Sequence, residues 1–444
     1  MRGEASLSDV RTFTKTTRLQ GEVRAPGELR AAAQALWLAA IADGESRFEH
    51  VPPEAAATLD ILEGLGVSIK RNGDGHGIVT VQGNGLGGLE PSSQTIDLDV
   101  PQEAALPALA ILSQQAFVSR VRIAPESREA AMQLLALLAR TGAAGVEEAE
   151  FLLRLDGTES PGGVRHEESD LPGAVKLGLL TAGLFAEVPT VVRESPSSKD
   201  RVDALLKIRG VAVEGSRQAD PTVRTMTLTP GAAPEALDMD IPGDVSRAMP
   251  FVVAGLSVPR SEVTVRRVML RPENRVFVDI VRQIGAELEI ADNDDGSVDL
   301  VLKASGRMKA TRVAGKRAQS LLDHVALLAV LATQTEGEFI IRDVESLRQG
   351  EFDFIEHLAD LLRAIEAKVG EYSYGLVIDG GRPLKGARIK TRRHPGLTQA
   401  FSVAGLLATG DMDIEDTACV DPVFPGFFDQ LDALRSPRKK EKTT

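Results

Sequence analysis

Short helical segments that end in a turn and a strand recur along this chain. Apolar residues at helical spacing, followed by a β-branched run, occupy 59–69, 132–146, 202–214, 278–290 and 358–371. A glycine usually stands near the expected end of the helix, where a left-handed residue stops it. The pattern predicts repeated copies of one unit, in which an outer helix turns directly into a strand.

A second, more apolar helix precedes each of these segments. Such stretches occupy 28–42, 103–117, 174–186, 245–256 and 320–334, and a sixth lies at 396–408, ahead of FPGFFDQL at 424–431. They are apolar on nearly every side, which is typical of buried helices rather than amphipathic surface helices. We therefore expect six similar α/β units, each built as strand, buried helix, strand, outer helix and strands, with three units in each of two domains.

The composition agrees with repetitive packing and excludes several functions. Only 4% of the 444 residues are aromatic, so Ala, Val, Leu and Ile must fill the cores. The net charge of −13 argues against nonspecific binding to nucleic acid or to an anionic membrane. We find no signal peptide and no transmembrane run, so we expect a cytoplasmic protein. The basic segment 435–444 is expected to be a disordered tail.

Cysteine and histidine give no sign of a metal site. Cys419 is the only cysteine, and the six histidines lie in different units without the spacing of metal ligands. We therefore expect no metal and no cofactor. His324 stands beside Asp323, but neighbouring residues on a helix point about 100° apart and seldom share one ligand.

Two long stretches carry a family resemblance. They are IPGDVSRAMPFVVAGLSVPRSEVTVRRVMLRPENRVFVDIVRQIGAELEI at 241–290 and FSVAGLLATGDMDIEDTACVDPVFPGFFDQL at 401–431, with further similarity in the first unit and at 198–211. In the order, the spacing and the local sequence of these stretches, the chain resembles the EPSP synthase (enolpyruvyl transferase) family. The resemblance implies a two-domain inside-out α/β barrel, in which 22–236 form one domain and 1–21 with 237–434 form the other.

The resemblance also implies a chemistry. The family transfers a carboxyvinyl group from phosphoenolpyruvate to a hydroxyl of shikimate 3-phosphate, in the shikimate pathway of aromatic amino acid biosynthesis. Its ligands bind where the buried helices begin, because helix N-termini favour anions. We therefore expect a small acidic or polar metabolite in the cleft between the domains, and a protein partner is a further possibility.

Most positions that bind the anionic substrates in this family differ in the present chain. Where the family has lysine or arginine, this chain has uncharged residues: Leu29, Gln34, Ala108, Ala130, Gly350, Phe354, Gly396 and Pro422. The Ser-Ser-Gln that holds the shikimate phosphate falls on Pro172, Gly173 and Ala174. Each lost charge-assisted hydrogen bond costs on the order of 1.5 to 3 kcal/mol, so phosphoenolpyruvate binding at that site is expected to be lost.

Two carboxylates remain at positions of catalytic residues in the family. Asp323 falls on its catalytic aspartate and Glu351 on its proton-donating glutamate, although either could instead be a carboxylate that stabilises the start of a helix. With the cations gone, both would tend to have raised pKa values that suit acid–base work.

Four further residues are candidates for substrate binding. Ser198 and Lys199 match a phosphate-side Ser-Lys of some members, Arg30 could be a relocated cation, and Gln34 occupies an arginine position. Ser198 could equally cap an outer helix, and Arg30 could be an exposed or inter-helix arginine. The turn 390–394, KTRRH, either offers displaced cations or is a solvated turn.

Three functions stay open at this stage. The first is a degenerate family member with a binding or interaction role, which has lost carboxyvinyl transfer. The second is a repurposed enzyme that uses Asp323 and Glu351 on another small ligand. The third is a divergent 3-phosphoshikimate 1-carboxyvinyltransferase, whose catalytic status as a transferase the sequence leaves uncertain.

Overall fold

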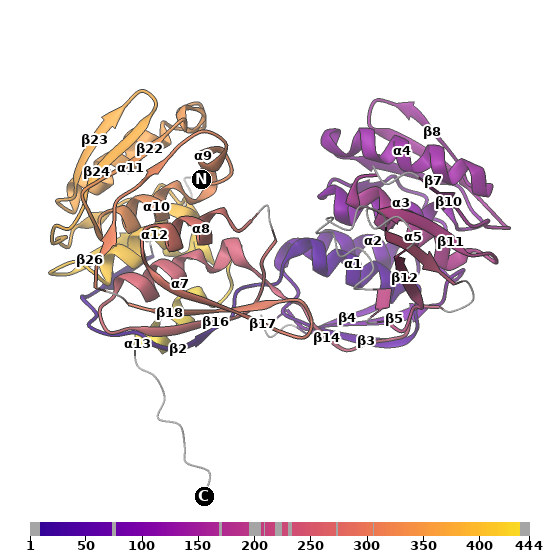
Figure 1. Ribbon diagram of the computed structural model, residues 1–444, viewed down its shortest axis with the longest axis horizontal. Coiled ribbons are helices and arrows are strands. Elements are labelled where there is room, and N and C mark those ends of the chain that lie inside the picture. Colours follow the sequence, from indigo (N-terminus) through magenta and orange to yellow (C-terminus); the bar gives the residue numbers. More distant parts are fainter. Residues whose placement is uncertain are drawn as a thin grey trace, which may run out of the picture. The chain divides into compact units, whose positions relative to one another are not determined.

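The structure of the chain is a computed structural model, and it divides into two units (Figure 1). It describes residues 9–72, 77–167, 171–194, 206–207, 209–217, 224–229, 233–271, 274–304 and 306–435. Unit 1 comprises 1–26 and 242–444, and unit 2 comprises 27–241. The chain thus passes between units at 26/27 and 241/242, five residues after each boundary expected from the sequence. Within the described ranges, no helix is long and apolar enough to span a membrane.

Unit 2 is built around three buried helices. These are α1 (Leu29–Ala40), α3 (Gln102–Ser113) and α5 (Gly173–Ala182), and α3 packs against both of the others. The outer helices are α2 (Ala56–Gly64) and α4 (Arg128–Leu138). Because the buried helices consist almost entirely of apolar residues, they form the centre of a core that the sheets and outer helices enclose.

Three four-stranded sheets cover these helices in unit 2. The first has the order β14 (Met239–Asp240), β3 (Asp43–Glu49), β5 (Val79–Asn84), β4 (Ser68–Arg71). The second is β6 (Ile96–Leu98), β7 (Ser119–Ile123), β9 (Leu152–Gly157), β8 (Ala144–Ala149). The third is β10 (Arg165–His166), β11 (Thr190–Glu194), β13 (Arg224–Leu228), β12 (Val213–Arg217). Each sheet combines one parallel pair with antiparallel pairs, as a repeated unit requires.

Unit 1 repeats the same plan. Its buried helices α7 (Val245–Ser257), α10 (Val325–Ala332) and α12 (Pro395–Gly405) contact one another. The outer helices are α8 (Val276–Gln283), α11 (Phe354–Ala364) and α13 (Phe427–Arg435), and α9 (Lys316–Gln319) is a single turn. The α/β architecture with buried helices inside and sheets outside is therefore present in both units, as the repeat predicted (Figure 1).

The amino-terminal strands complete two sheets of unit 1. β2 (Gln20–Val23) joins the sheet β15 (Gly243–Asp244), β16 (Glu262–Met269), β18 (Val298–Lys303), β17 (Glu287–Asp292). β1 (Val10–Phe13) pairs with β26 (Met412–Glu415) next to β25 (Arg388–Ile389). The remaining sheets are β20 (Arg312–Val313), β22 (Glu338–Arg342), β24 (Gly375–Asp379), β23 (Lys368–Tyr372), and the pair β19 (Met308–Lys309) with β21 (Thr335–Glu336). Residues from both ends of the chain therefore share one core.

The turn between outer helix and strand has the left-handed residue that the pattern predicted. Gly66 after α2 and Gly285 after α8 have φ values of 84° and 88°. After α11 the same position is Glu366, with φ of 60°, so the motif does not strictly need glycine. Most of the outer helix expected within 202–214, and the tail expected after Arg435, lie outside the described residues.

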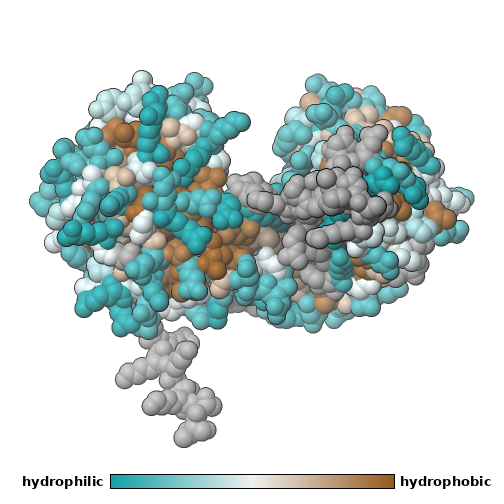
Figure 2. All heavy atoms as spheres, in the orientation of Figure 1, coloured by the Kyte–Doolittle hydropathy of each residue, from teal (hydrophilic) through white to brown (hydrophobic). Residues whose placement is uncertain are grey.

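The visible surface of both units is mainly polar, and unit 1 also shows an apolar area (Figure 2). Several hydrophobic residues of unit 1 are only partly covered, among them Leu270, Val276, Leu322 and Phe352. Two of these, Val276 and Phe352, belong to the sites described below.

Candidate functional site

The two expected catalytic carboxylates are both exposed in unit 1 and neither caps a helix. Asp323 lies in a short 3₁₀ turn, Leu322–His324, directly before α10, and α10 begins without a side-chain cap. Glu351 lies before α11, whose cap is Asp353, with its carboxylate 2.9 Å from the backbone nitrogen of Glu356. Neither carboxylate therefore caps a helix, but Asp323 lies in the first turn of the 3₁₀ segment that leads into α10, where a carboxylate also stabilises the helix start.

Aromatic and imidazole rings gather beside these carboxylates. The ring of Phe352, the residue after Glu351, lies 5.5 Å from the ring of His357 and 6.4 Å from that of His394, measured between centroids. Phe354 lies 5.1 Å from His394. These rings stand at and around Gly350, Phe354 and Gly396, three positions where the resemblance expects lysine or arginine. We call Phe352, Phe354, His357 and His394 the ring cluster.

Each histidine of the ring cluster is held by the backbone. The ring nitrogen Nδ1 of His394 accepts a hydrogen bond from the backbone N–H of Leu397 at 3.3 Å, and so caps α12. The ring Nε2 of His357 lies 2.9 Å from the carbonyl oxygen of Lys390, to which it donates because a carbonyl only accepts. Both rings therefore have fixed orientations.

Burial makes both imidazoles poor bases relative to free histidine. It lowers the pKa of His394 below its ordinary value, while the charge of Asp323 acts in the opposite direction and His357 adds to the lowering. Burial also lowers the pKa of His357, with a smaller contribution from Arg392. Both rings are therefore neutral near pH 7, and the interaction of His394 with Asp323 places a carboxylate close to one of them.

Two of the six histidines lie beside one phenylalanine ring of the ring cluster. His357 lies in α11 and His394 precedes α12, yet both lie beside Phe352, and His357 contributes to lowering the pKa of His394. Their separation in the sequence hid them, because only the packing of α11 against the turn before α12 brings them together. Among the described residues, no group of three His, Cys, Asp or Glu side chains could hold a metal ion.

The turn 390–394 contributes an arginine to this site. Arg392 and Arg393 both have left-handed backbone angles, with φ of 53° and 57°. The guanidinium of Arg392 lies over the ring of Phe352, 5.0 Å from its centroid. Such cation–π contacts stabilise by roughly 0.5 to 1 kcal/mol at exposed sites. The turn is thus ordered against the ring cluster and does more than connect two elements.

In unit 2, Arg30 and Gln34 are engaged by the chain's own acidic residues and backbone. The Arg30 Nε lies 2.9 Å from a carboxylate oxygen of Glu28, and its Nη1 lies 3.4 Å from one of Glu103. Gln34 donates to the backbone carbonyl of Glu103 at 2.5 Å. The other Glu28 oxygen accepts from the N–H of Ala31 and caps α1. An anion would therefore meet two carboxylates at the starts of α1 and α3.

The remaining contacts expected in unit 2 are those of Ser198, Lys199 and the start of α5. Ser198 and Lys199 lie outside the described residues. α5 begins after Pro172 with Gly173 and Ala174, and it has no side-chain cap. The first turn of this helix therefore carries no hydroxyl or amide that could hold a phosphate.

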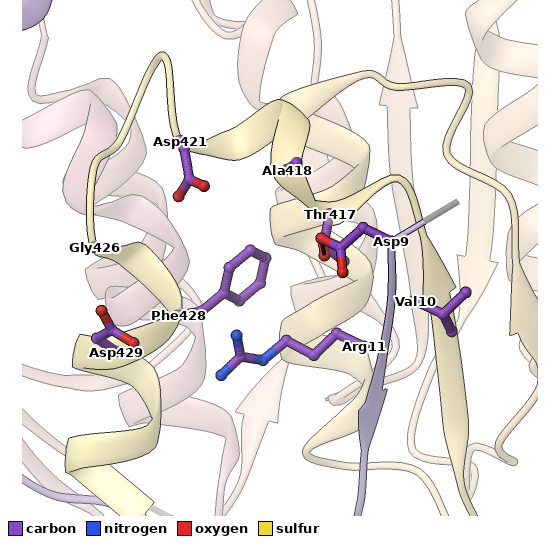
Figure 3. Close-up of a pocket in the computed structure, with 9 residues that line it drawn as sticks. All are labelled: Asp9, Val10, Arg11, Thr417, Ala418, Asp421, Gly426, Phe428 and Asp429. Atoms are coloured by element: carbon purple, nitrogen blue, oxygen red, sulfur yellow. Dashed lines mark hydrogen bonds between the residues drawn. The ribbon is translucent and has the colours of Figure 1, made fainter. Parts of the chain in front are cut away.

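A pocket in unit 1 involves none of the expected residues. It has a volume of about 360 Å³ and is lined by acidic side chains, including Asp9, Asp421 and Asp429, together with Phe428 (Figure 3). The guanidinium of Arg11 lies 4.7 Å from the centroid of Phe428 and also pairs with Asp432. Arg11 is thus a basic residue in the lining of an otherwise acidic pocket.

Comparison with known proteins gives a consistent result over nearly the whole chain. Residues 13–431 match the family model described as EPSP synthase (3-phosphoshikimate 1-carboxyvinyltransferase). Proteins named 3-phosphoshikimate 1-carboxyvinyltransferase are similar to it: one from Salinibacter ruber is 32% identical, covering 95% of this chain and 98% of its own, and one from Syntrophotalea carbinolica is 31% identical, covering 97% and 100%. A solved EPSP synthase from Acinetobacter baumannii shares the fold, with a TM-score of 0.71 at 23% identity, covering 96% of this chain and 98% of that one.

Proposed function

Because this chain belongs to the EPSP synthase family, we propose that it is a repurposed enzyme of that family. Asp323 and Glu351 carry out proton transfer on a small ligand bound at unit 1. That ligand carries less negative charge than the 3-phosphoshikimate named for the relatives.

The observation that carries this proposal is the ring cluster. Phe354 stands at a position where the resemblance expects a cation, and its ring lies against His394, with Phe352 beside them. Aromatic and neutral imidazole rings favour apolar and weakly charged ligands and give no strong clamp for a phosphate. Because burial lowers the pKa of both histidines, they stay neutral beside the carboxylates, and we assign the proton transfer to Asp323 and Glu351.

Unit 2, taken by itself, also disfavours a polyanion at the starts of its buried helices. The Glu28, Arg30 and Glu103 side chains sum to one negative charge, where the resemblance expects a positive site. Replacing several charge-assisted hydrogen bonds, each about 1.5 to 3 kcal/mol, by neutral groups lowers affinity for a polyanion by many orders of magnitude. A ligand with one negative charge or none loses far less.

A second candidate is 3-phosphoshikimate 1-carboxyvinyl transfer in the shikimate pathway. The names of relatives that are about one third identical over almost the whole chain favour it directly. In that case Arg392 and Arg393 are the displaced cations, and the two carboxylates keep their family roles. The third candidate is a protein that keeps the fold of the family and binds a ligand or a partner but catalyses no reaction.

One experiment separates the three outcomes. The purified chain is incubated in D₂O with shikimate 3-phosphate plus phosphoenolpyruvate, and separately with shikimate and other small hydroxy and keto acids. Phosphate release and loss of carbon-bound proton signals are followed by NMR. We expect no phosphate release, and proton exchange with at least one weakly charged acid. Asp323→Asn and Glu351→Gln should lower that exchange by about 10²-fold or more, as removal of a general acid or base does.

The matched control is Glu345→Gln, an exposed carboxylate in the same unit that lies outside the ring cluster. It should exchange at the wild-type rate. Phosphate release from the substrate pair would replace the proposal with the second candidate. If the chain exchanges protons with no compound and only binds, the proposal of an enzyme is wrong and the binding role stands.

A further inference from the structure

We infer that a small cavity in unit 1, separate from the ring cluster, binds an uncharged molecule about the size of phenol. The cavity has a volume of about 150 Å³ and lies where the first turn of α7, the start of α8 and the segment before α10 meet. A protein cavity of this volume is large enough to hold a benzene ring. This inference is independent of the proposed function, because it uses none of the residues proposed for proton transfer.

The lining explains why the ligand is uncharged. Apolar walls come from Met249, Val276 and Phe277, and polar groups come chiefly from Ser246, Asn274 and His324. No Asp, Glu, Lys or Arg side chain is among the described residues that line the cavity. Burial of a charge without a counter-charge is costly, so an ionised ligand is disfavoured here.

The imidazole of His324 gives the cavity a fixed hydrogen-bond acceptor. Its Nε2 lies 3.0 Å from the backbone carbonyl of Ser246, so Nε2 carries the hydrogen and donates it. In the neutral ring, Nδ1 is then left with a lone pair. The ring also packs beside Phe277, with centroids 6.0 Å apart, and this contact limits its rotation.

Asn274 and Ser246 supply further polar groups. The Asn274 side-chain oxygen accepts from the backbone N–H of Arg271 at 2.7 Å, and its Nδ2 donates to the carbonyl of Met269 at 3.0 Å. These bonds fix the amide and leave its second N–H available. The hydroxyl of Ser246 makes no hydrogen bond with any residue that the structure describes. A ligand with one hydroxyl beside an apolar ring can use both the acceptor and a donor.

The test uses three probes of similar size. Phenol is neutral and has a hydroxyl, benzene lacks the hydroxyl, and benzoate is charged at pH 7.5. Saturation-transfer NMR on the full chain gives a dissociation constant for each. We expect phenol to bind about fivefold more tightly than benzene, as one hydrogen bond gives, and benzoate to bind at least tenfold more weakly than phenol.

Two variants locate the binding. His324→Phe keeps a ring of similar shape and removes the acceptor, so the preference for phenol over benzene should decrease. Val276→Phe fills the cavity and should weaken phenol binding at least tenfold. Val369 is a partly covered valine on β23 outside the cavity, and Val369→Phe should leave phenol binding unchanged. The inference is overturned if no probe saturates the protein below 20 mM, which is roughly the range of weak fragment binding. It is also overturned if benzoate binds as tightly as phenol, or if the Val276→Phe variant binds phenol as tightly as the wild type.

Discussion

The buried arginine of unit 2 allows a quantitative prediction. Arg209 is fully buried, and its guanidinium faces no carboxylate among the described residues. It donates to the carbonyl oxygens of Glu235 at 3.2 Å and Ala35 at 3.1 Å, and lies 5.6 Å from the ring centroid of Phe48. Burial lowers the pKa of Arg209 to about 10. The side chain thus joins a turn to helix α1 at the cost of a desolvated charge.

These opposing effects can be compared in free energy. The pKa lies about 2.5 below the ordinary arginine value, so keeping the charge inside costs on the order of 3 kcal/mol. Two hydrogen bonds return about 1 kcal/mol each and the aromatic contact about 0.5 to 1 kcal/mol. We therefore expect Arg209→Met, which keeps an unbranched buried chain, to change the free energy of unfolding of unit 2 by less than about 1 kcal/mol. Arg209→Ala should lose about 2 to 4 kcal/mol, because it leaves a cavity.

The chain has a convenient reporter for this measurement. Trp37 is its only tryptophan, is almost fully buried, and lies in unit 2, whereas both tyrosines, Tyr372 and Tyr374, lie in unit 1. Urea unfolding followed by tryptophan emission therefore reports unit 2, and tyrosine emission reports unit 1 as an internal control. A loss above about 2 kcal/mol in Arg209→Met would refute the reasoning, since the hydrogen bonds would then outweigh the burial cost.

Three further predictions concern stability. Asp353→Ala removes the cap of α11 and the ion pair with Arg348 at 2.6 Å, and should destabilise unit 1 by about 1 to 2 kcal/mol in urea unfolding. Burial lowers the pKa of His394, so the unfolded chain binds a proton at this residue more readily than the folded chain does. The urea concentration at the unfolding midpoint of unit 1 should therefore be constant above about pH 6.5 and should decrease as the pH is lowered from there. Glu194→Gln removes a buried carboxylate that pairs with Lys176 at 3.4 Å and with Arg224 at 3.0 Å, and should cost unit 2 about 1.5 to 3 kcal/mol by tryptophan emission.

Each of these has a matched control. Asp360→Ala removes an exposed carboxylate of α11 that does not cap it, and should change stability little. His394→Asn should reduce the pH dependence of unit 1, and an unchanged dependence would assign the effect to another group. Glu214→Gln changes an exposed glutamate on β12, and a loss as large as that of Glu194→Gln would contradict the burial argument.

The sequence predicted the repeated elements well because they depend on local periodicity. The expected buried helix at 245–256 is α7, Val245–Ser257, and the one at 396–408 is α12, Pro395–Gly405. The left-handed stop was also visible as glycine, except at Glu366, where a non-glycine residue adopts it. Helix length and turn chemistry are encoded within about ten residues, so one chain suffices to read them.

The contacts within the candidate sites could not be read in the same way. Arg30 reaches Glu103 from a different helix, and His394 meets Phe354 from a different unit of the repeat. Such pairs depend on how helices pack, which periodicity does not specify. The sequence did identify Asp323 and Glu351 as candidates, but it could not show that neither caps a helix.

The starts of the helices explain why we place the chemistry in carboxylates. Free N–H groups at a helix start attract anions, but here side chains of the protein accept from them: Glu28 at α1, Asp244 at α7, Asp353 at α11 and His394 at α12. α3 has no such cap, yet Glu103 in its first turn already faces Arg30. α5 begins with apolar residues, and its Lys176 is paired with Glu194. At α1, α7, α11 and α12 the chain's own side chains thus accept from the N–H groups that would attract an anion, whereas α5 and α10 begin without a side-chain cap. The capped starts favour a ligand of low charge over a phosphate, and this is the kind of ligand that we propose.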